Sequence, residues 1–230
     1  NLRASEKERL WTLLVENMRP ENREYRYNFL YDNCTTRARD RIEEAVEGKI
    51  IYPEQDTVRT YREIIHQYTA QHPWAELGND ICLGAEADRP ISVRDEMFAP
   101  FYLLRYANGA VIQGSTRPLV LSQSKVVEGR DVEIQKEFPW SPALSVWILF
   151  FCVAGLTVVE RWRHACFWGI DIFLMSLVGG IGLVVTFLFF FSVHPTVGSN
   201  WQIWVFNPIP LVAMPWVVWC AVKRRKTYYH

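Results

Sequence analysis

Three long apolar runs in the second half of the chain constrain its fold more than any other feature. They cover residues 141–159, 167–193 and 204–222, and the only acidic or basic residue within them is Asp171. Each run is close to the roughly 20 residues that an α-helix needs to cross a bilayer. A soluble domain of this size does not bury three such runs in succession. The sequence therefore predicts an all-α transmembrane domain with three spans over residues 140–230.

Basic residues near the ends of the runs predict the orientation of these spans. Arg161 and Arg163 lie between the first and second runs, and Lys223-Arg224-Arg225-Lys226 follows the third. The segment 194–200 has no Lys or Arg. Because basic loops stay in the cytoplasm, we expect a cytoplasmic C-terminus, with residues 1–139 and segment 194–200 on the outer side. An outer aromatic belt is then expected at Trp140, Trp201 and Trp204.

Small residues and one acid in the second run suggest how the spans pack. Ser176 and Gly180 form a small-xxx-small pair with further glycines nearby, which predicts a close helix contact. Asp171 lies near the cytoplasmic end. We expect it to pair with a basic residue there, at position 161, 163 or 223.

Residues 1–139 are predicted to form an α+β domain in water. Acidic residues outnumber basic ones, and no basic tract with interleaved aromatics suggests a nucleic-acid partner. Ser5 and Glu8 have the spacing of a capping box, which predicts a helix that ends at Pro20. Further helices are expected over residues 58–70, which Pro73 ends, and after a Ser92 cap, with strands at 110–113 and 118–127. Residues 129–139 are expected to connect this domain to the first span.

A change of period around Cys34 predicts a strand that leads into a helix. Aromatic residues occupy every second position over residues 25–31, which is the pattern of a strand with one aromatic face. Asp32 and Asn33 are favoured N-cap residues. Beyond Cys34, apolar residues repeat at helical spacing until Gly48, where a C-terminal stop is expected: Ala38, Ile42, Ala45 and Val46.

This placement makes Cys34 a candidate nucleophile. The unpaired N–H groups and the positive end of the dipole in a first helical turn favour a thiolate over a thiol. Arg37 and Arg39 add positive charge, which nearby Asp residues partly cancel. An isolated cysteine is more often a small buried apolar residue or half of a disulfide. A bond to Cys82 is the main alternative, since the outer compartment permits disulfides.

The block Asp32-Asn33-Cys34-Thr35-Thr36-Arg37 resembles the bacterial Lnb-like lipoprotein N-acyltransferase family. Weaker matches touch most of the chain. They are Pro20-Glu21-Asn22-Arg23, Tyr25 to Tyr27, Arg39-Asp40, Tyr61-Arg62, Pro73-Trp74, Leu83-Gly84, Asp88, Glu96-Met97-Phe98-Ala99-Pro100, His194-Pro195-Thr196 and Asn207-Pro208.

The resemblance implies a periplasmic domain of the papain-like, NlpC/P60 type in the bacterial inner membrane. It implies that Cys34 takes a fatty acyl group from a phospholipid as a thioester and passes it to the N-terminal amine of a lipoprotein. Asn33, Thr35 and Arg37 are then candidates for catalytic or substrate-binding support. The resemblance also implies a partner histidine upstream of Asn1. Position 1 is not Met and no signal peptide is present, so we expect that the natural start is missing.

Three histidines are candidates on the outer side. His66 and His72 fall on or after a predicted helix, where an ordinary polar role is the simpler interpretation. His194 follows the second span at head-group depth, where it can bind phosphate, assist the transfer or simply cap the helix end. No Cys/His pair has zinc-ligand spacing and no Gly-rich phosphate loop is present, so no metal or cofactor is expected.

Two other functions stay open on the sequence. A papain-like cell-wall peptidase or amidase would use the same nucleophile, but it does not explain three closely spaced spans. A non-catalytic membrane scaffold would have an unreactive or disulfide-bonded Cys34.

Overall fold

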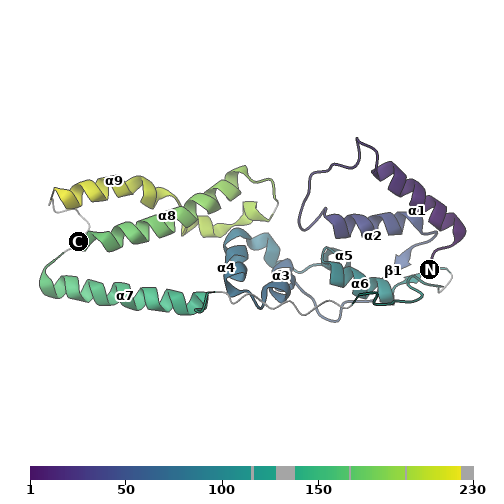
Figure 1. Cartoon of the computed structure of the whole chain (residues 1–230), viewed down its shortest axis with the longest axis horizontal. Helices are drawn as coiled ribbons and strands as arrows, with labels where there is room; N and C mark the ends of the chain where they lie inside the picture. Colours follow the sequence, from purple (N-terminus) through teal and green to yellow (C-terminus); the bar gives the residue numbers. More distant parts are fainter. Residues whose placement is uncertain (115–116, 128–137, 166, 195, 224–230) are drawn as a thin grey trace. The chain divides into compact units, whose positions relative to one another are not determined.

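The computed structural model describes residues 1–114, 117–127, 138–165, 167–194 and 196–223. The chain forms two compact units: residues 1–64 with 89–133, and residues 65–88 with 134–230. Figure 1 shows their helices and strands. The predicted connector falls mostly outside the described residues, as do Arg224, Arg225 and Lys226 of the C-terminal basic segment.

The first unit combines helices with one small sheet. Its helices are α1 (Ala4–Asn17), α2 (Cys34–Ala45), α5 (Val93–Glu96) and α6 (Pro100–Gly109), and α3 (Tyr61–Thr69) begins in it. The strands β1 (Ile50–Ile51), β2 (Val111–Ile112) and β3 (Arg117–Pro118) form an antiparallel sheet in that order. Ile112 pairs with both Ile50 and Arg117. The prediction of a mixed domain ahead of the spans is confirmed, with fewer strand residues than expected.

Apolar packing in the first unit joins segments far apart in the sequence. One cluster surrounds the sheet and consists of Val46, Ile50, Ala110, Ile112 and Leu119. A second is aromatic, because the buried Tyr61 ring makes edge contacts with Tyr31 and Phe98. Beside these clusters the fully buried Glu6 carboxylate binds Arg117, at 2.5 and 2.9 Å, and accepts from the Arg3 and Glu47 backbone. A buried charge needs such partners.

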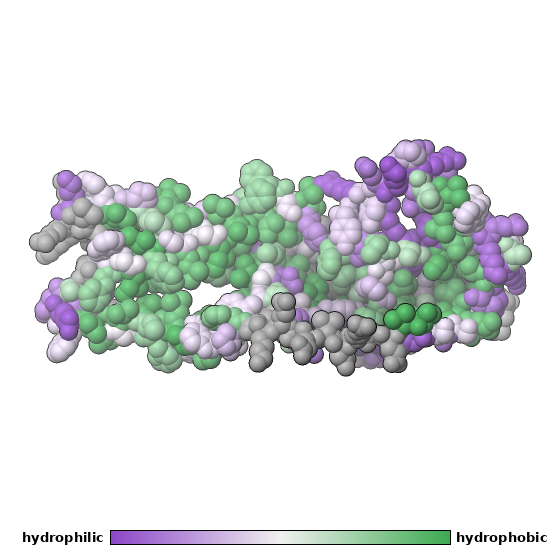
Figure 2. Space-filling model, viewed as in Figure 1, coloured by the Kyte–Doolittle hydropathy of each residue, from purple (hydrophilic) through white to green (hydrophobic). Residues whose placement is uncertain are grey.

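The second unit contains the apolar helices. They are α7 (Pro142–Arg163), α8 (Trp168–Phe191) and α9 (Ile209–Val222), and their surfaces are mostly hydrophobic in Figure 2. Three candidate membrane spans result, over residues 142–163, 168–191 and 201–220, which confirms the predicted three-span region. The third is not one continuous helix. The short helix η3 (Trp201–Trp204) precedes an irregular stretch, and α9 begins only after Pro208.

Two glycines let α8 pack closely against the third span. A Cβ atom at Gly179 would lie 2.6 Å from Leu211 Cγ, and one at Gly182 would overlap the backbone of Asn207. At Gly180 a Cβ would meet nothing within 4 Å. The predicted close contact therefore exists, but it runs through Gly179 and Gly182 rather than through Gly180 of the predicted small-xxx-small pair.

Residues 65–88 pack with the segment that joins α8 to α9. They form α4 (Pro73–Cys82) and η1 (Ala85–Asp88), and the joining segment contains η2 (Val197–Ser199). Several hydrogen bonds connect them, among them Gly84 N–H to the Thr196 carbonyl (2.9 Å), Asn200 Nδ2 to the Ile81 carbonyl (2.7 Å) and Gln202 Nε2 to the Asp80 carbonyl (2.8 Å). Because Asn200 is buried, its amide needs such a partner.

Three local predictions were wrong. Residues 25–31 form no strand, since Asn28 and Asp32 bridge across a tight turn. The first helix is not capped by Ser5. Instead the Glu6 carboxylate accepts from the Arg3 N–H at 2.6 Å. The predicted end of a helix before Pro73 is confirmed, because α3 ends at Thr69, and Pro73 also begins α4, since a proline at N1 has no N–H to leave unpaired. The strand predicted over 118–127 ends at Pro118.

Candidate functional site

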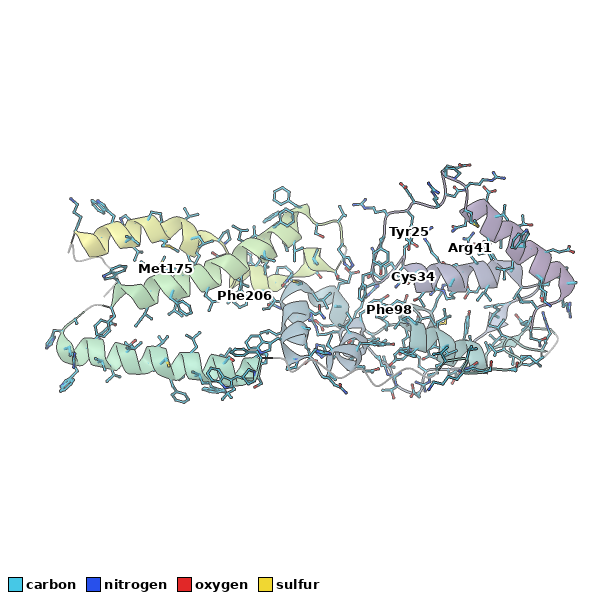
Figure 3. All side chains as sticks on the ribbon, viewed as in Figure 1. Tyr25, Cys34, Arg41, Phe98, Met175 and Phe206 are labelled. Atoms are coloured by element: carbon cyan, nitrogen blue, oxygen red, sulfur yellow. The ribbon has the colours of Figure 1, made fainter. Side chains whose placement is uncertain are left out.

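Cys34 is the first residue of α2, as the sequence predicts, and its side chain is exposed. The preceding Asn33 is the N-cap. Its Oδ1 accepts from the N–H groups of Thr35 and Thr36 at 2.8 and 2.9 Å. Its Nδ2 donates to the carbonyls of Phe29 (2.8 Å) and Phe98 (3.0 Å). The buried Asn33 amide therefore joins the start of α2 to two other segments, and Figure 3 shows Cys34 and Phe98 in this region.

The turn before α2 presents Cys34 at the surface. Asn28 Oδ1 accepts from the N–H groups of Leu30 and Tyr31, both at 3.1 Å, and the backbones of Asn28 and Asp32 exchange two hydrogen bonds. Leu30 is buried, so the turn is anchored in the core. The aromatic alternation that suggested a strand places Phe29 and Tyr31 against Phe98 and Tyr61 respectively.

A hydroxyl group lies near the sulfur. Thr35 Oγ1 is 4.0 Å from Cys34 Sγ, at the limit of a hydrogen bond to sulfur. Burial raises the pKa of Tyr27, and negative charge on Cys34 raises this pKa further. Tyr27 therefore stays protonated at neutral pH. Nothing in its alternating aromatic pattern separates it from its neighbours, so sequence reasoning missed it.

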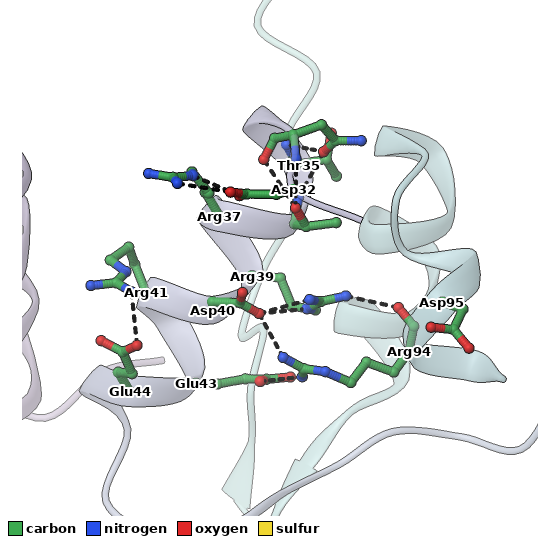
Figure 4. A network of polar contacts seen from close by, with 12 residues as sticks. Asp32, Thr35, Arg37, Arg39, Asp40, Arg41, Glu43, Glu44, Arg94 and Asp95 are labelled. Carbon is green, nitrogen blue, oxygen red and sulfur yellow. Dashed lines mark hydrogen bonds and ion pairs between the residues drawn. The ribbon is translucent and has the colours of Figure 1, made fainter. Parts of the chain in front are cut away.

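The arginines that follow Cys34 are paired with acids. Arg37 forms a bidentate ion pair with Asp32, at 2.7 and 2.8 Å, and its guanidinium lies 3.4 Å from the centre of the Tyr25 ring. The ion pair raises the pKa of Arg37, so this side chain stays charged. The nearly buried Arg39 binds Asp40 and the Arg94 carbonyl. Figure 4 shows the ion pairs of Arg37 and Arg39 and the bond to the Arg94 carbonyl. These contacts hold α2 in place and neutralise much of the positive charge.

The thiols of Cys34 and Cys82 are both free. The two residues belong to different units, and burial raises the pKa of the Cys82 thiol. The alternative of a Cys34–Cys82 disulfide is therefore not realised in the structure. Cys166, a third cysteine of the sequence, lies outside the described residues.

An apolar groove runs beside Cys34. Its volume is about 400 Å³, which lies in the range of roughly 300–1,000 Å³ typical of small-molecule sites. Besides Cys34, its main side chains are Ala38, Ile42, Tyr52, Leu103, Leu104 and Leu119. The sequence predicted the apolar face of α2 but not this groove, because α6 and residue 119 complete it from far along the chain.

Of the five histidines of the sequence, the four among the described residues belong to the second unit: His66, His72, His164 and His194. His194 is half-buried, and its Nδ1 lies 2.9 Å from Thr196 Oγ1. Burial lowers the pKa of His194, against a smaller opposing effect of Glu86, so its neutral form is favoured at neutral pH. His66 Nε2 is 2.8 Å from an Asp80 oxygen.

The part of the chain that the structure describes holds no group of three or more His, Cys, Asp or Glu side chains suited to a metal ion. The exposed cysteine, its capped helix and the apolar groove are the features of the first unit that can support chemistry on an acyl group. A cysteine at a helix N-terminus is a nucleophile in many acyl-transfer enzymes.

Two family models match the chain. The model of the Lnb N-terminal periplasmic domain matches residues 1–67, and that of the Lnb transmembrane domain matches residues 133–230. The comparisons with curated proteins and with solved structures gave no match. The first model covers Cys34 and the second covers all three candidate spans. The chain therefore belongs to the Lnb-like family, as a membrane protein with a periplasmic segment that is related to lipoprotein N-acylation.

Proposed function

We propose that the protein transfers a fatty acyl group from a phospholipid to the N-terminal amine of a lipoprotein, through a thioester on Cys34. The single observation that carries this proposal is an exposed, free cysteine at a capped helix N-terminus in the periplasmic segment of an Lnb-like membrane protein. Both proposed substrates reside in the bilayer to which the three spans would anchor the enzyme. A soluble cell-wall peptide would need no such anchor.

The reaction takes two balanced steps. The Cys34 sulfur attacks the ester carbonyl of the phospholipid, so that a C–S bond forms, the C–O bond breaks, and the lysophospholipid leaves with the proton of the thiol. The lipoprotein amine then attacks the thioester carbonyl. An amide bond forms, the C–S bond breaks, and a proton from the amine returns to the sulfur. Covalent catalysis of this kind divides one difficult transfer into two easier ones.

Residues beside Cys34 have positioning roles in this proposal. Asn33 holds the first turn of α2 in place through its four hydrogen bonds. Arg37 fixes the preceding turn through Asp32, and the Thr35 hydroxyl faces the sulfur at 4.0 Å. His194 supports head-group binding from the segment that follows α8, as a neutral hydrogen-bonding group rather than a cation. Its partner hydroxyl is that of Thr196.

The proposal places the protein in the bacterial inner membrane. Residues 1–139 and segment 194–200 would face the periplasm, and the C-terminus the cytoplasm, because the basic residues flank the opposite ends of the spans. A cysteine introduced at Gly198, in a variant without native cysteines, should react with an impermeant thiol reagent in intact cells whose outer membrane is permeable to it. One placed after Lys226 should not. The reverse pattern would contradict this orientation.

Replacement of the nucleophile tests the chemistry. In the natural full-length protein, Cys34→Ser should abolish N-acylation of diacylated lipoprotein, because an alcohol is a weaker nucleophile and its ester transfers to an amine less readily than a thioester. Cys82→Ser is the matched control and should leave the activity unchanged. After incubation with phospholipid, mass spectrometry should find an acyl adduct on Cys34 that hydroxylamine releases. Full activity of Cys34→Ser would refute the thioester mechanism, whereas an absence of N-acylation by the parent protein would favour the scaffold.

A further inference from the structure

The groove beside Cys34 has a defined direction along α2. Cys34, Ala38 and Ile42 all line it, and each is four residues from the next, so they share one face of the helix. At 1.5 Å per residue, this face carries the groove about 6 Å from Cys34 to Ala38 and about 12 Å to Ile42. Cys34 therefore stands where the helix begins, and the groove continues away from it.

A second helix forms the opposite wall. Leu103, Leu104 and Ala107 of α6 line the groove at helical spacing, so two apolar faces border the same space. Near Ile42 the groove meets the cluster around the sheet, where Leu119 is buried and Tyr52 packs against it. The wall is thus apolar along its length, and its far end is formed by the core of the unit.

The apolar side chains of this groove are incompletely covered. Ala38 is exposed, Ile42 is half-buried, and Leu104 is 43% exposed. Single exposed apolar residues are common on protein surfaces, but a continuous apolar patch marks a binding surface. Of the polar residues in the lining, Arg39 binds Asp40 and the Arg94 carbonyl, and the Thr35 hydroxyl lies at the head of the groove beside Cys34.

We propose that this groove holds the fatty acyl chain while the chain is bound to Cys34 as a thioester. The inference rests on the proposed function and adds the site that would select the acyl group. A group attached to the sulfur starts at the head of the groove, and a long apolar chain can follow the groove without leaving polar atoms unpaired. The lysophospholipid departs with the thiol proton, so the chain alone stays behind.

The test compares two donor lipids with the same head group, one with palmitoyl and one with butyryl chains, supplied as an equimolar mixture to the full-length protein. The measurement is the ratio of palmitoyl to butyryl thioester on Cys34 by mass spectrometry. Ala38→Phe places a ring one helical turn from the sulfur, at an exposed position where the core is not disturbed. We expect this ratio to fall tenfold or more, while the butyryl adduct still forms.

Two further variants make the result decisive. Val58→Phe adds the same ring at a 64% exposed apolar position outside the groove, and its ratio should equal that of the parent. Leu104→Gln makes the opposite wall polar and should also lower the ratio. If Ala38→Phe yields no folded protein, the ratio measured for Leu104→Gln decides whether the groove holds the acyl chain.

The possible failures are distinguishable. If the parent forms no adduct with either donor, the proposed function is wrong and this inference fails with it. If the parent forms both adducts but the groove variants keep the parental ratio, the thioester chemistry stands and the groove assignment is overturned. If Ala38→Phe yields no folded protein and Leu104→Gln keeps the parental ratio, the groove assignment is likewise overturned.

Discussion

Replacement of Asn33 by alanine should destabilise the first unit more than any ordinary surface substitution. The variant loses the helix cap, which costs about 1 kcal/mol. It also leaves the carbonyls of Phe29 and Phe98 without their amide donor, at about 1 kcal/mol each when buried. The sum is about 3 kcal/mol. At about 4 °C per kcal/mol for a domain near 100 residues, the melting temperature should fall by roughly 10 °C.

This change in melting temperature can be measured by thermal unfolding of the purified full-length protein in detergent, with limited proteolysis as the readout. Asn33→Ser retains a capping oxygen but has no amide hydrogens for the two carbonyls, so it should lose about 2 of these 3 kcal/mol. Asn108→Ala removes an exposed asparagine whose hydrogen bond to Gln123 lies in solvent, and it should stay within about 0.5 kcal/mol of the parent. Equal melting temperatures for Asn33→Ala and Asn108→Ala would refute the idea that this amide fixes the start of α2.

Three further predictions follow from other contacts. The Arg117 hydrogen bonds lower the pKa of Glu6 to about 2, so the stabilisation by this carboxylate is complete above about pH 4.5 and is lost as the pH falls toward 2. In thermal unfolding, Glu6→Gln should have a free energy of unfolding about 3 kcal/mol lower than the parent at neutral pH, and it should lose this acid dependence. Gly182→Ala should lower the yield of folded protein in detergent, whereas Gly180→Ala should not, and equal yields would contradict the close packing of α8. His194→Ala should slow acyl transfer in membranes without reducing the inserted amount, and an unchanged rate would leave His194 as a helix-end residue.

The features that the sequence predicts well are those set by local pattern. The three spans follow from uninterrupted apolar runs, and the start of α2 follows from an N-cap residue placed just before a helical repeat. Ser92 likewise caps α5, since its side chain accepts from Asp95 N–H. In each case the interactions that decide the structure lie within a few residues, so no distant contact can override them.

The features that the sequence did not reveal depend on distant partners. Aromatic alternation over residues 25–31 suits a strand, yet the rings pack around Tyr61 and Phe98, and Asn28 closes a turn instead. The groove needs α6, which lies about sixty residues beyond α2. The small residues of α8 are visible in the sequence, but which of them meets a neighbour depends on where the third span lies.

The broken form of the third span bears on how the chain enters the membrane. At 14 residues, α9 is about 21 Å long, which is shorter than the roughly 30 Å hydrocarbon layer. The third candidate span also has the lowest mean hydropathy of the three, 1.5 against 2.2 and 2.5. Its irregular backbone around Asn207 must be covered by protein to be stable among lipid tails, and Gly182 of α8 supplies that cover. We therefore expect α7 and α8 to insert into the bilayer by themselves. The third span, which is synthesised after α8, should insert only as it packs against α8.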